Sequence, residues 1–329
     1  MHTLVTGGAG FIGSALVERL LAEGHTVDVV DNLSTGSLQH LADARAEAGR
    51  ALTFHQLDVR SPDVADLIVR RDPEVVWHLA ALTELDSARR SPAAHAHINV
   101  VGALGVLEGV RAAATRKLVV TSAAGVYGEL AGLGPARESR PRRPTTPEAI
   151  AKHTVDAYLA AFAGVDSVVF TSLVVASVYG ARSATGVIAE WSRALVAGRP
   201  CTVFGDGAQQ RDFVFVDDVV DALARAADQG DGMILNVGTG TATSLTELHG
   251  LMVETAARLA VELERPDADD RGPALGLRHA EGRRGDLEAI VVDPARAAEA
   301  IGWSPWTTLA DGLEQVLRAL WPVAEDGGT

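Results

Sequence analysis

The sequence has one cysteine, two lysines and no hydrophobic run long enough to cross a membrane. The lone Cys201 excludes an internal disulfide framework and fits a reducing cytoplasm. A membrane-spanning helix needs about 20 consecutive apolar residues, and no stretch reaches that length. No basic segment followed by an apolar one precedes the first predicted strand, so we expect no secretory leader. We therefore expect a cytoplasmic protein without a membrane partner.

Positive charge is also scarce. The formal net charge of -14 argues against nucleic acid or an anionic membrane surface as a partner. It does not exclude a phosphorylated ligand, because a few local basic residues are enough to hold one. The two lysines, Lys117 and Lys152, stand in a chain that otherwise uses arginine. With 47% hydrophobic and 22% charged residues in a chain of 329, the composition is that of one large or two intermingled globular domains.

The most informative stretch is the glycine-rich run Thr3–Gly13 near the N-terminus. A short apolar segment enters a turn and an amphipathic helix follows, so the pattern predicts strand, glycine turn and helix. Glycines let such a turn approach a pyrophosphate, whose charge is favoured at a helix N-terminus. A second strand over 26–30 ends at Asp31, 18 residues past Gly13 and close to the roughly 20 expected for an acid that binds a ribose 2′-hydroxyl. The stretch predicts dinucleotide binding, and the acid favours NAD.

Later segments continue the alternation of strands and helices. We expect strands over 52–57, 75–81, 118–122 and 167–176, and long helices over 92–114 and from Pro147. This order predicts an α/β fold with a Rossmann-type, doubly wound parallel sheet. His78, at the end of a strand, is interpreted as a packed histidine and not as a catalyst. From about Tyr179 the alternation changes, which indicates an added, smaller C-terminal α/β lobe.

The ordered motifs resemble the extended short-chain dehydrogenase/reductases, and within them the NAD-dependent nucleotide-sugar epimerase/dehydratase family typified by UDP-glucose 4-epimerase. The resemblance runs from residue 3 to about 320. Its markers are Thr6-Gly7-Gly8-Ala9-Gly10-Phe11-Ile12-Gly13, Asp31-Asn32-Leu33-Ser34-Thr35-Gly36, His78-Leu79-Ala80-Ala81, Asn99-Val100-Val101-Gly102, Val126-Tyr127-Gly128, Gly205-Asp206-Gly207, Gln210-Arg211-Asp212-Phe213-Val214, Asn236-Val237-Gly238-Thr239-Gly240, Arg284-Gly285-Asp286 and Leu309–Leu313.

The resemblance implies two lobes, one that binds the cofactor and one that binds the substrate. Residues 1–176 and about 212–235 would bind NAD, and about 177–211 with 236–329 would bind a UDP- or dTDP-linked sugar. It also implies a homodimer in which helices 92–114 and 147–163 pack against their copies. Val155, Leu159 and Phe162 are compatible with such packing. It implies no metal.

Individual site residues follow from the same resemblance. Residues expected to contact the cofactor are Gly7, Gly10, Phe11, Ile12, Gly13, Asp31, Asn32, Ser34, Thr35, Gly36, Asp58, Val59, Leu79, Ala80, Ala81, Asn99, Thr121 and Lys152. Residues expected to contact the substrate are Thr83, Ala123, Ser177, Arg211 and Arg283, with Arg284 as a competing choice for the last. The two arginines suit a diphosphate because planar guanidinium groups bind phosphate oxygens in a fork. Surface ion pairing is the plainer interpretation of both.

The chemical centre departs from the family pattern. Family members oxidise a sugar hydroxyl with a Tyr-x-x-x-Lys pair and a nearby Ser or Thr, but here Glu148 precedes Lys152 and Ala123 occupies the hydroxyl position. Ser122 or Thr121 would substitute only with a shift of the turn. A carboxylate, with an ordinary pKa near ~4.3 against ~10 for a phenol, is a much weaker base toward an alcohol. Glu148 and Lys152 also have the spacing of a helix ion pair, worth only about 0.3–0.5 kcal/mol.

Three functions remain open at this point. The first is an epimerase- or dehydratase-like enzyme in which Glu148 is an unconventional acid or base, with Lys152 and Ser122 as the other catalytic candidates. The second is an elimination or a proton transfer beside a carbonyl, for which a carboxylate is better suited. The third is a non-catalytic protein that binds NAD or a nucleotide sugar. Fold resemblance alone does not choose among them.

Overall fold

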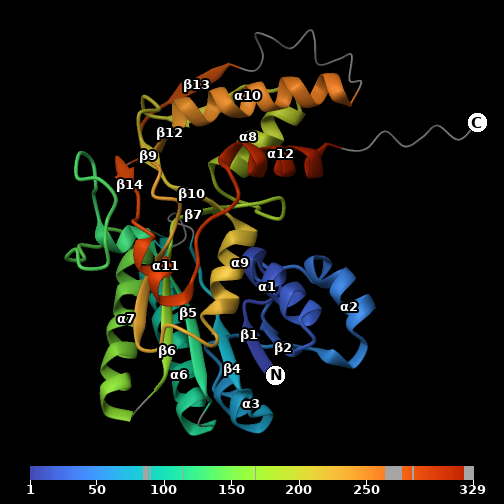
Figure 1. The fold of residues 1–329 in the computed structure, drawn as a ribbon, viewed down its shortest axis with the longest axis vertical. Helices are drawn as coiled ribbons and strands as arrows, with labels where there is room; N and C mark the ends of the chain where they lie inside the picture. The colour runs from blue at the N-terminus through green and yellow to red at the C-terminus, as the bar shows by residue number, and fades with distance from the viewer. Residues whose placement is uncertain are drawn as a thin grey trace, which may run out of the picture.

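The fold is that of a computed structural model, which describes residues 1–83, 88, 90–113, 115–166, 168–263, 276–283 and 285–321. Seven parallel strands form its central sheet, in the order β11-β6-β5-β4-β1-β2-β3 (Figure 1). These strands are β1 (His2–Thr6), β2 (Thr26–Asp31), β3 (Leu52–Gln56), β4 (Val75–His78), β5 (Lys117–Ala123), β6 (Phe170–Val175) and β11 (Met233–Val237). The sequence-based prediction of a doubly wound parallel α/β fold is confirmed.

Helices cover both faces of this sheet, and strands such as β1, β4 and β5 bury apolar side chains on both faces. They are α1 (Phe11–Ala22), α2 (Ala42–Ala48), α3 (Asp63–Arg71), α5 (Pro92–Ala96), α6 (Gly102–Ala113), α7 (Pro147–Asp166), α9 (Val216–Arg225) and α11 (Ala295–Ile301). Short 3-10 turns are η1 (Leu38–Leu41), η2 (Gly49–Ala51) and η4 (Ala124–Tyr127), and a π-helical turn is η3 (His97–Val101).

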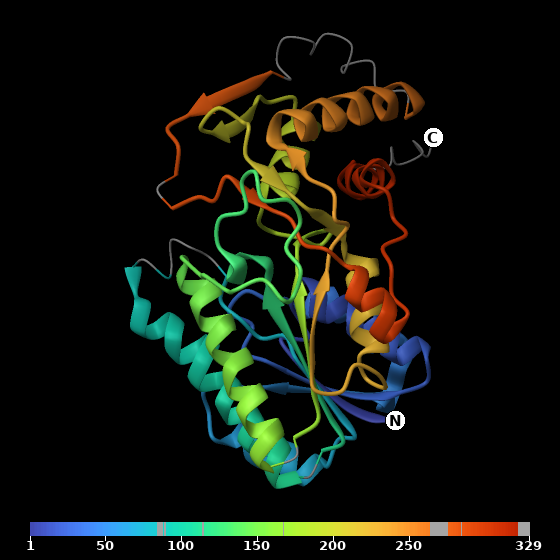
Figure 2. The same ribbon diagram turned by 60° about the vertical axis from the view of Figure 1, so that its left-hand side comes forward.

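Alternate side chains of each strand enter two different cores. In β1, Val5 packs with α1 and α9, whereas Leu4 packs with α3, α6 and α7. In β5, Val119 joins the first core, and Leu118 and Val120 join the second. Figure 2 shows α6 and α7 side by side on one flank of the sheet. The period of two along each strand therefore fixes which helices lie on which face.

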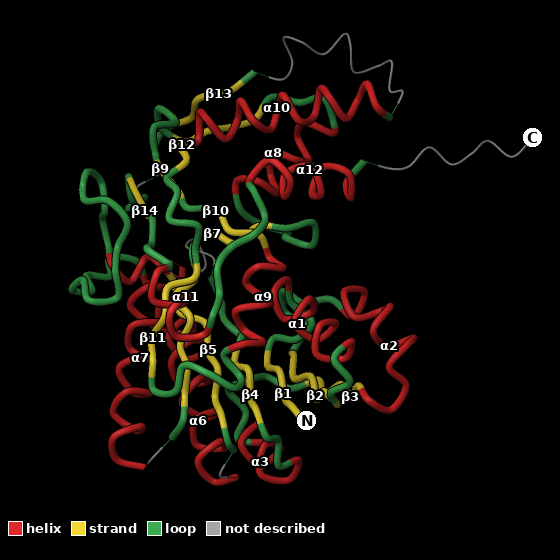
Figure 3. Tube along the Cα trace, viewed as in Figure 1, coloured by secondary structure: helices red, strands yellow, loops and turns green. Residues whose placement is uncertain are grey.

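A second group of elements lies beyond the sheet. Figures 1 and 3 show its three helices gathered at the top of the molecule, away from most of the sheet. The helices are α8 (Val187–Val196), α10 (Leu245–Glu262) and α12 (Leu309–Leu320). The strands are β7 (Ser177–Tyr179), β8 (Cys201–Phe204), β9 (Gln210–Arg211), β10 (Phe213–Phe215), β12 (Thr243–Ser244), β13 (Leu277–Ala280) and β14 (Ala289–Ile290). The division into two lobes at the residues given above stays a prediction.

The chain enters this upper group before the large sheet is complete. After β6 it runs through β7 to β10, returns as α9, and only then adds β11 beside β6. Helix α9 packs on α1, and residues of both α9 and β11 belong to the hydrophobic core on one face of the sheet. The two groups are therefore joined by several crossings of the chain.

Two expected elements differ in detail. The helix expected over 92–114 contains the π-helical turn η3, which separates α5 from α6. The strand expected from Arg211 is broken at Asp212, whose carboxylate accepts hydrogen bonds from the backbone N–H groups of Thr239 and Gly240. Asn99 of η3 bonds Leu82, 17 residues earlier, and Asp212 bonds residues 27 and 28 positions later. A local sequence pattern does not contain either contact.

Candidate active site

The glycine turn between β1 and α1 is shaped by close backbone contacts. Gly7 has a φ of +72°, and a Cβ atom there would lie 2.7 Å from the backbone nitrogen of Ala80. A Cβ at Gly13 would lie 2.1 Å from the carbonyl oxygen of Gly7. No larger residue fits either position without moving the backbone. The turn therefore lies directly against the end of β4, as a dinucleotide-binding loop does.

Asp31 is the last residue of β2, and its carboxylate binds the backbone of two loops. Its carboxylate accepts a hydrogen bond from the Ala9 N–H at 3.0 Å and another from the Leu33 N–H at 2.8 Å. A carboxylate has about four acceptor positions, so two remain for ribose hydroxyls. Gly36 packs against Ala9, and a Cβ there would lie 3.0 Å from Asp31 Oδ2. The acid is thus held at the edge of the glycine turn.

A cavity of about 470 Å³ opens over this turn and the carboxyl ends of β1, β2, β4 and β5. Most residues expected to contact the cofactor line it. They are Gly7, Gly10, Phe11, Ile12, Gly13, Asp31, Asn32, Ser34, Thr35, Asp58, Val59, Leu79, Ala80, Ala81 and Thr121. Asp58 accepts two hydrogen bonds from the Arg60 guanidinium, which holds the pKa of Asp58 well below its ordinary value, and one from the Asn32 side chain. The glycine turn, its acid and the small residues ending β4 fit NAD.

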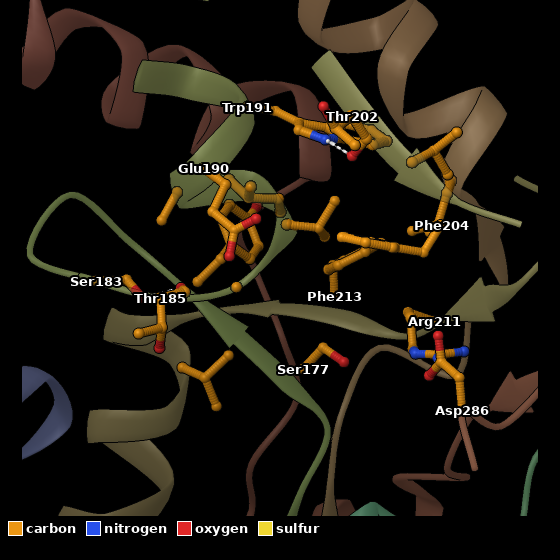
Figure 4. A pocket seen from close by; sticks show the side chains of 18 of the residues that line it. Ser177, Ser183, Thr185, Glu190, Trp191, Thr202, Phe204, Arg211, Phe213 and Asp286 are labelled. Atoms are coloured by element: carbon orange, nitrogen blue, oxygen red, sulfur yellow. Dashed lines mark hydrogen bonds and ion pairs between the residues drawn. The ribbon is translucent and has the colours of Figure 1, made fainter. Parts of the chain in front are cut away.

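A second, larger cavity of about 920 Å³ adjoins the first. Thr83, Ser183 and Thr185 line both. Among the predicted substrate residues, Thr83, Ser177, Arg211 and Arg283 line the larger cavity. Figure 4 shows Arg211 beside Asp286 on the side away from Ser183 and Thr185.

Two of the arginines that line this cavity are already oriented by neighbours. Arg211 Nη2 donates to Asp286 Oδ1 at 2.7 Å, and Nη1 donates to the carbonyl oxygen of Gln210 at 2.8 Å. The Arg283 guanidinium lies 3.8 Å from the centre of the Phe204 ring, a cation–π contact. The competing Arg284 lies outside the described residues. A larger cavity with two fixed guanidinium groups suits a ligand that carries phosphates.

Lys152 and Glu148 lie one turn apart on α7, near the end of β5. Lys152 is buried and donates from Nζ to the carbonyl oxygen of Thr121 at 2.7 Å. Among the described residues, no ion pair or hydrogen bond joins Glu148 to Lys152. Burial raises the pKa of Glu148 to about 6, although the charge of Lys152 acts in the opposite direction. Burial also lowers the pKa of Lys152. The helix ion pair considered above is not formed in the structure.

Ser122 belongs to a different polar cluster. Its hydroxyl donates to Asp156 Oδ2 at 2.8 Å, and Arg142 and Ser172 bind the same buried carboxylate at 2.6 and 2.5 Å. Ala123, the next residue of β5, carries no hydroxyl. The strand end therefore offers neither the family hydroxyl nor a free serine in its place.

His78 is packed in the way that the sequence indicates. Its Nδ1 lies 2.8 Å from the Thr6 hydroxyl, and the side chain is buried. Burial lowers the pKa of His78 to about 3, and the charge of Lys152 adds to this. The ring is therefore neutral near neutral pH and supports the ends of β1 and β4.

Comparison with known proteins decides the family. Residues 3–238 match the NAD dependent epimerase/dehydratase family. The chain belongs to this family. Over 324 residues it is 39% identical to a UDP-glucose 4-epimerase of Mycolicibacterium smegmatis, covering 97% of this chain and 98% of that one. Members of this family are NAD-dependent enzymes, and NAD is their cofactor.

Solved structures agree with this assignment. The UDP-glucose 4-epimerase of Thermotoga maritima with UDP-glucose has a TM-score of 0.88 and 33% identity, covering 97% of this chain and 98% of that one. The UDP-glucose 4-epimerase of Thermus thermophilus in complex with NAD has a TM-score of 0.85 and 32% identity, with the same two coverages. The fold of this epimerase/dehydratase family member is therefore that of structurally characterised enzymes.

Some predicted site residues of this family member line neither cavity. Glu148, Lys152, Ser122 and Ala123 are not among the residues that line either cavity, and their part in catalysis or substrate binding stays a prediction. Asn99, on the π-helical turn, bonds both the N–H and the carbonyl of Leu82, at 2.7 and 2.8 Å. It supports the segment beside Thr83. The expected contact between Asn99 and the cofactor also stays a prediction.

The cavities contain residues that the sequence patterns did not single out. Arg182 lines the NAD cavity, where it pairs with Glu18 at 2.6 Å and bonds the Ser14 hydroxyl. His40 lines the same cavity and lies 3.0 Å from the Ala9 carbonyl oxygen. Glu190 lines the larger cavity from α8. Arg182 follows a second Val-Tyr-Gly, at residues 178–180, which is the one local signal that could have found it.

Proposed function

We propose that this protein is an NAD-dependent enzyme that acts on a nucleotide-activated sugar, with Glu148 and Lys152 in place of the family's tyrosine and lysine. The observation that carries the proposal is the union of two cavities through Thr83, Ser183 and Thr185. The smaller fits NAD, and the larger presents Arg211 and Arg283 to a diphosphate. Similar proteins are named UDP-glucose 4-epimerases, so a UDP-linked sugar is the first substrate to test.

When bound in the smaller cavity, NAD would supply reversible hydride transfer with a sugar carbon. The chain's own residues then have to move the sugar's proton and hold the reacting groups in place. Lys152, fixed on the Thr121 carbonyl beside the NAD cavity, would orient the cofactor's ribose and favour negative charge nearby. Glu148, with a pKa raised to about 6, is suited to take or give a proton near neutral pH.

Glu148 is better suited to remove a proton from a sugar carbon than from a sugar hydroxyl. A group with a pKa of about 6 is still a much weaker base than a phenolate. Carboxylates serve as the base that removes a proton beside a carbonyl in other enzymes, so elimination or proton transfer there suits Glu148 better. This is the second form of the proposal, and it uses the same two cavities.

A non-catalytic binding protein is the alternative, and one observation favours it. Ala123 lacks a hydroxyl, and Ser122 is held by Asp156, so neither of these two residues offers a free hydroxyl to the sugar. Such a protein would keep NAD and nucleotide-sugar affinity without turnover.

The test is conversion of UDP-glucose, UDP-galactose and dTDP-glucose in the presence of NAD, followed by chromatography of the sugars and by absorbance of reduced nicotinamide. We expect product with the wild type, and loss of turnover with Glu148→Gln and Lys152→Ala. Glu254→Gln, an exposed glutamate on α10, is the control and should behave as wild type. Turnover that survives both Glu148→Gln and Lys152→Ala would disprove the assigned roles. UDP-sugar and NAD binding without any conversion would establish the alternative.

We also propose a cytoplasmic homodimer formed by α6 and α7. Ile150, Tyr158 and Val165 of α7 are exposed at 49%, 42% and 80%, and they give that helix an apolar outer surface. Of the residues first considered for this contact, Val155 and Leu159 are buried inside the protomer's own core.

In the described part of the chain, no helix is both long and apolar enough to cross a bilayer.

A further inference from the structure

The loop between η4 and α7 is attached to the segment that carries β14. The Leu130 N–H donates to the Ala289 carbonyl at 3.2 Å, and the Ala136 N–H donates to the Val291 carbonyl at 2.9 Å. The loop continues to Pro147, where α7 begins. It therefore connects the helix of Glu148 and Lys152 with the upper group of elements.

The side chain of Glu129 bonds both the loop and the segment that carries β14. Glu129 Oε1 accepts hydrogen bonds from the N–H groups of Leu130, Ala131 and Ala289, at 2.8, 2.9 and 2.9 Å. Its Oε2 accepts from the Glu288 N–H at 2.6 Å. Partial burial acts to raise the pKa of Glu129, but these backbone donors together hold it below its ordinary value. A single carboxylate thus fixes the loop and the strand to each other.

The strand held by Glu129 in turn holds Arg211. The Gln210 N–H donates to the Glu288 carbonyl at 2.7 Å, and β14 pairs with β9 so that Ile290 lies opposite Arg211. Asp286, two residues before Glu288, binds the Arg211 guanidinium at 2.7 Å. Figure 4 shows these two side chains together at one end of the larger cavity. Glu129 is therefore connected to the Arg211 guanidinium by its hydrogen bond to Glu288, the short backbone stretch from Glu288 to Asp286, and the ion pair between Asp286 and Arg211.

We propose that Glu129 is a positioning residue for the nucleotide-diphosphate site, acting through Glu288, Asp286 and β9 on the orientation of Arg211. The inference rests on the proposed function, in which Arg211 binds the substrate's diphosphate. Glu129 lines neither cavity, so it acts without touching the ligand. An ionised carboxylate suits this task because it accepts all four N–H groups, whereas an amide would present its own donors to some of them.

The experiment measures UDP and NAD affinity separately, by titration calorimetry, for the wild type and Glu129→Gln. We expect UDP to bind at least about tenfold more weakly to the variant and NAD to bind within about twofold of wild type. Amide hydrogen exchange should also rise at Glu288 and Ala289. If Glu129→Gln does not fold, Glu129→Asp, which withdraws the carboxylate by one methylene group, replaces it with the same split expected.

Arg137→Ala provides a matched control. Arg137 lies on the same loop and pairs with Asp293 at 2.9 Å, but it is 77% exposed and reaches the segment that follows β14. UDP and NAD affinity should both stay at the wild-type value. Equal losses of UDP affinity in the control and in Glu129→Gln would overturn the proposal, as would unchanged UDP affinity in Glu129→Gln or an equal loss of UDP and NAD. A wild type that binds NAD but not UDP would instead refute the proposed function.

Discussion

Glu148→Gln is expected to stabilise the fold at neutral pH while it abolishes turnover. Burial raises the pKa of Glu148 from 4.5 to about 6, so the folded chain disfavours the carboxylate. At about 1.4 kcal/mol for each pKa unit, ionised Glu148 costs the folded state about 2 kcal/mol. Because the side chain is only partly buried, this figure is an upper value. The neutral amide removes the cost, and with it the proton-transfer group.

The sign of the effect sets its pH window. The folded pKa lies above that of the unfolded chain, so the cost is absent below about pH 4.5 and fully present above about pH 6. Glu148→Gln should therefore match the wild type at the lower pH and exceed it in free energy of unfolding at the higher. A gain in stability together with lost activity is the pattern of a residue kept for function.

Urea denaturation followed by circular dichroism gives the free energy of unfolding at each pH. Glu254→Gln should leave the difference between the two pH values unchanged. A Glu148→Gln variant that is less stable than wild type above about pH 6 would refute the reasoning, because the carboxylate would then gain more from Lys152 than it loses by burial.

Three further changes test the cofactor turn, the phosphate site and the dimer. Gly13→Ala puts a Cβ 2.1 Å from the Gly7 carbonyl oxygen and should abolish NAD binding in a fluorescence titration; normal affinity would contradict the assigned turn. Arg211→Lys keeps the charge but loses the fork that Asp286 orients, so UDP should bind about tenfold more weakly by calorimetry, and unchanged affinity would place the diphosphate elsewhere. Tyr158→Glu adds charge to the exposed surface of α7 and should give monomers in sedimentation velocity, whereas a wild-type monomer would remove the dimer proposal.

The sequence predicted the sheet well because its signals are local. The glycines from Gly7 to Gly13 and the acid at Asp31 act within one strand–turn–helix–strand unit, and the later strands β4 and β5 bury apolar side chains on both faces. Proline at 147 begins α7, as a first-turn proline favours. These features need no knowledge of distant contacts.

The site was less predictable because its determining contacts are distant in sequence. Ser122 is held by Asp156, 34 residues later, and Lys152 is held by a carbonyl 31 residues earlier. Glu129 bonds backbone 159 and 160 residues away. A motif gives the identity of such a residue but not its partner, so the absence of a Glu148–Lys152 ion pair became visible only in the folded chain.

The late arrival of β11 has a consequence for biosynthesis. A nascent chain that has emerged only as far as residue 176 possesses six strands of the sheet, and β6 is then an open edge with unpaired backbone groups. That edge is closed only when residues 233–237 emerge, about sixty residues later, with α9 arriving just before them. Ribosome-bound fragments between these lengths should therefore be the aggregation-prone ones, and a truncation made at the apparent end of the nucleotide-binding sequence would isolate that exposed edge.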